Sequence, residues 1–167
     1  MPETAASTQS SSPVIYRSEV RAVPAGAGIK LVTLPTEPQP VPMGMHGAVA
    51  AHYKLADGTF TPHAATLDYL VGGAAACLLG TLSRALHVRE IAADADRLQM
   101  SAVGEHESED GVLVLKRIHV VAHLRAPAAQ REAAERVFNV FASKCPVHQS
   151  ICKAIDITTV LDFQPLA

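Results

Sequence analysis

The sequence is poor in aromatic residues and has no strong charge of either sign. It contains no tryptophan, four phenylalanines and three tyrosines, so it has little of the aromatic surface on which single-stranded nucleic acids stack. Its 14 Lys and Arg residues nearly balance its 16 Asp and Glu residues, for a net charge of −2. Proteins that hold a phosphate backbone present a basic face. We therefore expect no nucleic-acid partner.

Targeting segments are also missing. The first residues, MPETAASTQSSSP, have neither the positive stretch nor the apolar stretch of a secretory signal. The longest apolar run, residues 67–82, is interrupted by Asp68 and by glycines, and it is shorter than the roughly 20 residues of a membrane-spanning helix. We expect a cytoplasmic protein that does not associate with membranes. Its three cysteines then point to redox, catalytic or buried thiols instead of a disulfide framework.

The length and composition suit one hydrophobic core. The chain has 167 residues, 49% of them hydrophobic, which is enough for one well-buried core and short of the usual size of two domains. Residues 1–13 are rich in Ser, Thr and Ala without periodicity, so we predict a disordered tail there. A single domain is predicted over residues 14–167.

The N-terminal third predicts strands. Apolar and polar residues alternate over residues 14–23, the turn PAGAG follows, and residues 29–34 form a second run, which indicates a hairpin. Residues 35–42 hold four prolines, which exclude a central strand and predict an extended connection. We expect a third strand near residues 47–55.

Residues 67–87 predict a helix that is apolar almost all round, with glycines and alanines gathered in its middle. A helix apolar on every side is buried. Each glycine inside a helix costs about 1 kcal/mol relative to alanine, so close packing against another backbone is expected to offset that cost. A dimer contact would provide such packing.

The second half predicts a hairpin, two helices and a last strand. The strands are expected at residues 97–107 and 113–124 around the turn SEDG, the helices at residues 126–143 and 146–154, and the last strand at residues 155–163. The order is βββ-α-ββ-αα-β, an α+β fold. No Walker loop or dinucleotide fingerprint is present, so nucleotide-dependent chemistry has no support.

Two cysteines stand in contrasting settings. Cys145 precedes a proline and follows Lys144, and a thiolate is stabilised at a helix start beside a cation. Cys77 lies within the apolar helix, where an isolated cysteine is most often a small buried hydrophobe. The two are 68 positions apart. Any partnership between them must therefore come from the tertiary structure.

Two segments carry a family resemblance. TLDYLVGGAAACLLGTL, followed after two strands and a helix by KCPVHQSICKAIDITTVLDF, resembles the OsmC superfamily, which comprises osmotically inducible proteins and organic hydroperoxide resistance proteins. The resemblance covers about residues 14–165. It implies an OsmC-like α+β fold and an intertwined homodimer with central buried helices and two active sites at the interface.

The resemblance also implies a reaction. The cysteine of the central helix, Cys77, attacks an organic hydroperoxide and becomes a sulfenic acid, and Cys145 resolves it as a disulfide. A thiol reductant, typically a dihydrolipoyl group in the family, then resets the pair. Neither a metal ion nor an organic cofactor is implied. Apolar neighbours such as Val71, Leu78 and Leu79 suit an alkyl or lipid hydroperoxide.

The chain departs from the family at the groups that orient the peroxide. The family's well-studied peroxidases have an acid ten positions before the cysteine, where this chain has Leu67. Asp68 lies nine positions before Cys77, a helical rotation of about 180°, so in a regular helix it faces away from the thiol. The alternative is that Asp68 is an acid of the first turn that complements the helix dipole. The family's arginine is missing from the first hairpin loop. Arg21 is the preferred candidate cation, with an ordinary surface residue as the alternative.

The histidines match no metal motif. His46, His52 and His63 are unevenly spaced before the central helix, so we expect solvated or hydrogen-bonded side chains instead of zinc ligands. One of them, His63, is also a candidate for lining the pocket. His119 and His123 share one face of a strand about 13 Å apart, which is too far for one metal ion.

Two residues follow Cys145 on the short helix. His148 is three positions on, where it is a candidate to lower the thiol pKa or to act as a base, and a surface histidine is the alternative. Cys152 is two helical turns away, about 10 Å, and is expected in the core.

Three functions are thus open at this point. The first is a thiol-dependent peroxidase acting through Cys77 and Cys145. The second keeps the fold but makes the pocket a binding site for an apolar or electrophilic small molecule, without efficient turnover. The third is acyl or hydrolytic chemistry at Cys145 with His148 as the base.

Overall fold

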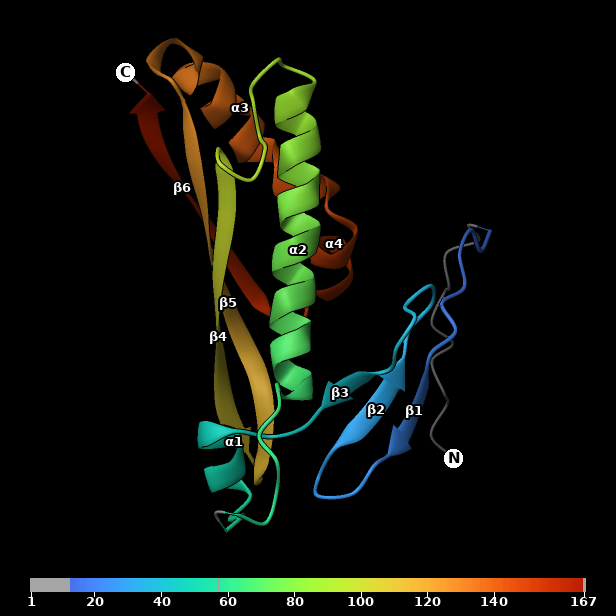
Figure 1. Cartoon of the computed structure of the whole chain (residues 1–167). Helices are drawn as coiled ribbons and strands as arrows, with labels where there is room; N and C mark the ends of the chain where they lie inside the picture. Colours follow the sequence, from blue (N-terminus) through green and yellow to red (C-terminus); the bar gives the residue numbers. More distant parts are fainter. Residues whose placement is uncertain (1–12, 57, 167) are drawn as a thin grey trace, which may run out of the picture.

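The computed structural model describes residues 13–56 and 58–166, and it is an α+β fold (Figure 1). The elements are β1 (Arg21–Pro24), β2 (Lys30–Thr33), β3 (Val41–Met43), α1 (Gly47–His52), α2 (Thr66–His87), β4 (Leu98–Glu109), β5 (Val112–Pro127), α3 (Arg131–Phe141), α4 (Pro146–Ile151) and β6 (Asp156–Leu166). Two 3-10 turns, Ala128–Gln130 and Ala142–Lys144, flank α3.

The strands form two separate sheets. The first has the order β1-β2-β3, is antiparallel, and stands apart from the rest of the molecule in Figure 1. The second has the order β4-β5-β6, in which β4 and β5 form an antiparallel hairpin. Because β6 is parallel to β5, the chain must cross back between them, and α3 and α4 make this crossover.

Helix α2 packs along one face of the second sheet (Figure 1). Its fully buried residues recur every four positions, which places them in one stripe on the helix. The stripe joins the inward residues of β5 and of α3 in a single hydrophobic cluster. The central members are Ala74, Leu78, Leu82, Leu86, Ile118, Val120, Leu124, Val137 and Phe141.

The predicted strand at residues 14–23 is wrong over most of its length. Only Arg21–Pro24 pairs, with Lys30–Thr33 of β2, while the residues before it are exposed and unpaired in the described part of the chain. The partner strand ends at Thr33 because Pro35 follows closely, and proline cannot continue a ladder of hydrogen bonds. Residues 14–20 alternate between apolar and polar side chains but therefore have no partner strand.

The predicted third strand at residues 47–55 is also wrong. Residues 47–52 form α1, in keeping with the helix preference and low strand preference of the three alanines in GAVAAH. The third strand is instead β3, inside the proline-rich stretch. It is an edge strand of its sheet, where a proline such as Pro42 is tolerated.

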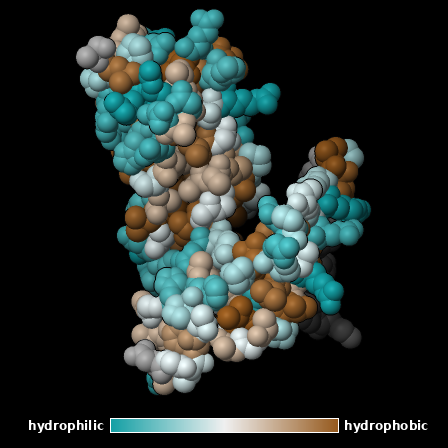
Figure 2. Space-filling model, viewed as in Figure 1, coloured by the Kyte–Doolittle hydropathy of each residue, from teal (hydrophilic) through white to brown (hydrophobic). Residues whose placement is uncertain are grey.

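Burial of α2 on every side is a third expectation that the single chain does not meet. Gly72, Gly73 and Gly80 are exposed, and a Cβ atom added to any of them would have no neighbour within 4 Å. Figure 2 shows white to brown residues gathered over the middle of the body, where α2 lies. No close packing within the described chain accounts for these glycines.

Helix α2 is longer than the apolar run of residues 67–82, a run too short by itself to span a membrane. The helix has 22 residues, and by length and composition alone it is able to cross a membrane. Core helices of soluble proteins pass the same test, and the stripe of α2 belongs to the hydrophobic cluster of the second sheet. The predicted tail, residues 1–13, lies outside the described residues except for Pro13, and the single domain stays a prediction.

Gly104 sets how closely β4 approaches α2. A Cβ atom at this position would lie 2.5 Å from Cγ2 of Val71, and the branched valine side chain has little freedom to move away. We expect Gly104→Ala to lower the free energy of unfolding by about 1–3 kcal/mol, measured by chemical denaturation. Val71→Ala in the same chain should recover part of that loss. If Gly104→Ala lowers the free energy of unfolding equally in the wild type and in the Val71→Ala variant, this explanation is contradicted.

Candidate active site

The fold brings Cys77 and Cys145 together. Cys77 is half-buried midway along α2, whereas Cys145 is fully buried as the N-cap residue of α4. The Cys145 thiol lies close enough to Cys77 to raise its pKa, and both thiols are free. The 68 positions between them in the sequence are spanned by the hairpin β4–β5 and by α3. The structure therefore supplies the tertiary partnership that the sequence left open.

The proline after Cys145 orients its thiol. Pro146 is the first residue of α4, a position where its fixed φ suits a helix start. A residue before proline is kept out of the helical region, and Cys145 has φ −82° and ψ 120°. The chain thus breaks between α3 and α4 at Cys145. Its side chain joins the hydrophobic cluster that also contains α2.

The surroundings of Cys77 disfavour its thiolate. Burial is the main cause that raises its pKa above the ordinary value, and the neighbouring Cys145 thiol raises it further. The backbone N–H of Val147, in the first turn of α4, donates a hydrogen bond to the sulfur and acts in the opposite direction. Among the described residues no cation contributes to this balance. At neutral pH the thiolate fraction is accordingly below that of a free cysteine.

Asp68 caps α2 instead of facing the thiols. Its Oδ2 atom accepts a hydrogen bond from the Ala65 N–H at 2.6 Å and pairs with His46 Nε2 at 2.6 Å. Partial burial raises the pKa of the Asp68 carboxyl, but the bonds to His46 and Ala65 outweigh this and hold it below its usual value. Nine residues of helix separate Asp68 from Cys77, a rise of roughly 13–14 Å.

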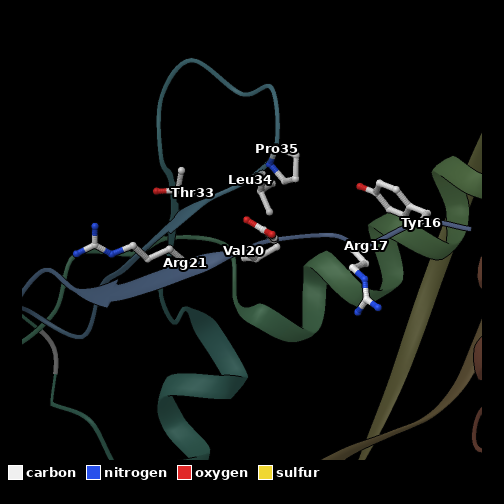
Figure 3. A pocket seen from close by; sticks show the side chains of 8 residues that line it. Tyr16, Arg17, Val20, Arg21, Thr33, Leu34 and Pro35 are labelled. Atoms are coloured by element: carbon white, nitrogen blue, oxygen red, sulfur yellow. The ribbon is translucent and has the colours of Figure 1, made fainter. Parts of the chain in front are cut away.

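Two more candidates lie away from the thiol pair. The His63 N–H donates to the carbonyl oxygen of Met45 at 3.2 Å in the segment before α2, and Cys77 is eleven residues into that helix, about 16 Å along its axis. Arg21 is on β1, in the sheet that stands apart, and lines a cavity of about 620 Å³ with Tyr16, Arg17 and Glu19 (Figure 3). In the single chain neither residue contacts a thiol.

His148 is half-buried on α4, and its Nδ1 atom is buried without a hydrogen-bond partner. The Nδ1 atom of His148 therefore forms no hydrogen bond with the Cys145 thiol, so the geometry gives no support to a Cys145–His148 hydrolase.

Cys152 ends α4 and is half-buried, so its expected place in the core is wrong. The catalytic and supporting roles of all these residues stay predictions.

Four of the five histidines that the sequence analysis weighed as metal ligands form side-chain hydrogen bonds, His46 being the one paired with Asp68. His52 bonds to the carbonyl oxygen of Gly111 at 2.9 Å, and His119 and His123 lie on the outer face of β5, where they bond to Thr158 and Asp162. In the described part of the chain, no group of three or more His, Cys, Asp or Glu side chains is placed to hold a metal ion.

A groove beside the thiols was not predicted from the sequence. The groove has a volume of about 450 Å³ and runs between α2 and α3. Apolar residues that include Val137, Val140 and Phe141 line it, together with the cations Arg84, Arg89 and Lys144. It begins at Thr81, whose hydroxyl donates to the carbonyl oxygen of Cys77, and reaches Lys144, next to Cys145. Its walls come from helices far apart in the sequence. No local pattern could have revealed it.

Comparison with known proteins decides the family. A family model described as OsmC-like protein matches residues 58–160, which include α2, both thiols and most of the second sheet. The chain belongs to the OsmC-like family. The resemblance stated from the sequence, and the OsmC-like α+β fold, are thereby confirmed. A search of curated proteins finds no match.

Solved structures share the fold at low sequence identity. The OsmC-like protein of Mycoplasma pneumoniae is 16% identical, with a TM-score of 0.69 over 90% of this chain and 99% of that one. The organic hydroperoxide resistance protein OhrB of Bacillus subtilis is 15% identical, with a TM-score of 0.58 over 90% and 100%. A putative organic hydroperoxide resistance protein of Vibrio cholerae, with captopril bound in one of its active sites, is 17% identical, with a TM-score of 0.59 over 94% and 99%.

The direction of the Cys77 pKa shift predicts how its reactivity changes with pH. Only the thiolate reacts with iodoacetamide, so alkylation of Cys77 should keep rising with pH beyond the point where a free cysteine levels off. Peptide mass spectrometry of the native protein follows the rate, and the same protein unfolded in denaturant is the control. A native midpoint below the unfolded one would show that a positive charge from outside the described chain reaches the thiol.

Proposed function

We propose that the protein is a thiol-dependent peroxidase that reduces organic hydroperoxides. The observation that carries this proposal is the proximity of the free thiols of Cys77 and Cys145 in a chain of the OsmC-like family. Two thiols close together are the arrangement that a sulfenic acid needs for rapid condensation to a disulfide.

The difference in exposure supports the order of the two roles. Cys145 is fully buried, whereas Cys77 is partly exposed, so a peroxide reaches Cys77 first. The Cys77 thiolate attacks the terminal oxygen of the hydroperoxide, the O–O bond breaks, and the alkoxide leaves as the alcohol after taking a proton. Cys77 is then a sulfenic acid, and Cys145 displaces its hydroxyl as water to form the disulfide. A dithiol reductant returns both sulfurs to thiols.

The apolar groove supports an alkyl or lipid hydroperoxide as the substrate. It lies one helical turn beyond Cys77 and extends to the residue before Cys145, so an apolar chain bound there would hold its peroxide end near the thiols. OhrB of Bacillus subtilis is named for organic hydroperoxide resistance. A dihydrolipoyl-type reductant and a cytoplasmic location belong to the same proposal.

A second candidate function is a binding protein for an apolar or electrophilic molecule, without efficient turnover. The observation that favours it is the raised pKa of Cys77, with no cation beside the sulfur in the described chain, because peroxide reduction requires the thiolate. Under this alternative, apolar ligands raise the melting temperature of the wild type and of a Cys77→Ser, Cys145→Ser variant alike.

We further propose that the protein is a homodimer in which a second copy covers α2. The open glycine face of α2 and the N-terminal sheet that stands apart from the body (Figures 1 and 2) support this arrangement, since exposed apolar surface of this kind is typical of a protein interface. In such a dimer, Arg21 reaches a thiol pair only across the interface.

Substitution of the single cysteines tests the peroxidase. Cys77→Ser should abolish consumption of an organic hydroperoxide, since it removes the partly exposed thiol of the pair. Cys145→Ser should allow one turnover and leave Cys77 oxidised, and Cys152→Ser should retain activity as the matched control. In the wild type, one equivalent of hydroperoxide should remove about two mass units from the Cys77–Cys145 pair. Unmodified thiols in the wild type would exclude the peroxidase.

A large side chain on the open face of α2 tests the dimer. Gly73→Leu places a bulky group where a partner backbone would approach, so sedimentation should show a shift from dimer to monomer. Val103→Leu, on the exposed outer face of β4, is the control and should leave the dimer intact. A wild type that sediments as a monomer at all concentrations would contradict the proposal.

A further inference from the structure

A further cavity lies on the face of the β4-β5-β6 sheet that is turned away from α2. It has a volume of about 280 Å³ and is separate from the thiols, which are on the other side of the sheet. Side chains from all three strands line it, together with the segment that leads into β4. The lining residues are Asp96, Arg97, Gln99, His123, Arg125 and Gln164.

Arg97, which directly precedes β4, and Arg125 of β5 both line this cavity. The Arg125 N–H donates to the carbonyl oxygen of Arg97 at 2.8 Å, which continues the pairing of Leu98 with Leu124. Directly opposite residues of an antiparallel pair have their side chains on the same face, and like charges placed in this way are destabilising. The sheet therefore carries an unfavourable pair of positive charges at this end.

Neither arginine forms an ion pair with another residue in the described part of the chain. No ion pair within 4.0 Å of either guanidinium is formed there, although Asp96 is part of the lining. By contrast Arg117, on the same face of β5, is held by Glu105 and Glu107 at 2.5 and 2.7 Å. Two arginines and one carboxylate line the cavity, so it keeps a net positive charge, whereas the charge of Arg117 is paired.

His123 is held in place as one wall of the cavity. Its Nδ1 atom bonds to Oδ2 of Asp162 at 3.0 Å, and its Nε2 atom bonds to Oγ of Ser101 at 3.1 Å. The same Asp162 oxygen accepts a bond from Gln164 at 2.9 Å. The bonds to His123 and Gln164 hold the pKa of the Asp162 carboxyl below its usual value. That carboxylate is consequently engaged with its own partners and does not serve the arginines.

We propose that this cavity binds a phosphate group, free or carried by a small monoester. Two guanidinium groups line the cavity, and their forked N–H donors match the oxygens of a tetrahedral oxyanion. A bound dianion would relieve the repulsion between Arg97 and Arg125. The site is compact, and the acidic residues Glu105, Glu107 and Asp162 occupy the rest of the face, which does not suit an extended nucleic acid.

The test is a titration of the full chain with inorganic phosphate and, in parallel, with glycerol phosphate. Resonances of the arginine side chains, observed by NMR, report binding at the site itself. We expect saturable binding in the wild type and a loss of about tenfold or more in affinity for Arg97→Gln and for Arg125→Gln, because each removes charge-assisted hydrogen bonds. Tighter binding of glycerol phosphate would assign the site to a monoester, and tighter binding of the inorganic ion to free phosphate.

Arg117→Gln is the matched control, since this arginine lies on the same face but is already paired. It should bind phosphate as the wild type does. Equal weakening by Arg117→Gln would show a general charge effect and overturn the site, as would the absence of saturable binding of either compound at about 10 mM, a concentration far above ordinary ligand affinities.

Thermal unfolding separates a binding role from a structural one. Because the two arginines repel each other, Arg125→Gln should melt no lower than the wild type in phosphate-free buffer and should lose the stabilisation that phosphate gives. A melting temperature well below that of the wild type without phosphate would identify Arg125 as structural and contradict the proposal. Hydroperoxide consumption does not enter this test, so its outcome is independent of the peroxidase.

Discussion

The buried stripe of α2 is the contact on which the rest of this structure depends. Its residues at four-residue intervals fill the space between the β4-β5-β6 sheet and the crossover helices α3 and α4. Gly104 permits the close approach on the sheet side, because any side chain there would collide with Val71. The same packing holds Cys77 at one height along the helix and presses α4 against it. The geometry of the thiol pair is thus a consequence of core packing.

Burial of the thiol pair has two opposing effects. It protects a sulfenic acid from water and from further oxidation, but it also raises the pKa of Cys77 and lowers the amount of reactive thiolate. The N–H of Val147 offsets only part of that rise. A positive charge brought by a second copy of the chain would lower the pKa of Cys77 and restore the reactive thiolate. The open glycine face of α2, where we propose that the second copy binds, is therefore linked to the reactivity of Cys77.

The sequence predicted several elements well and others poorly, for identifiable reasons. Residues 66–87 contain a long apolar run, the hairpin β4–β5 follows two strand patterns around a turn, and Pro146 marks the start of α4 by its fixed φ. Residues 14–20 alternate like a strand but have no strand to pair with, and residues 47–52 are a short alanine-rich run whose structure depends on context. Short segments carry too little local preference to override their neighbours.

By itself the sequence determined the family, the α+β class, the central helix and the two cysteines of interest, because these depend on local periodicity, proline geometry and residue order. Only the tertiary structure decided that Cys77 lies near Cys145, that the pKa of Cys77 is raised, and that Asp68 caps a helix far from the sulfur. It also placed Arg97 opposite Arg125. Each of these facts depends on the packing free energy of segments distant in the chain, and no local pattern contains that free energy.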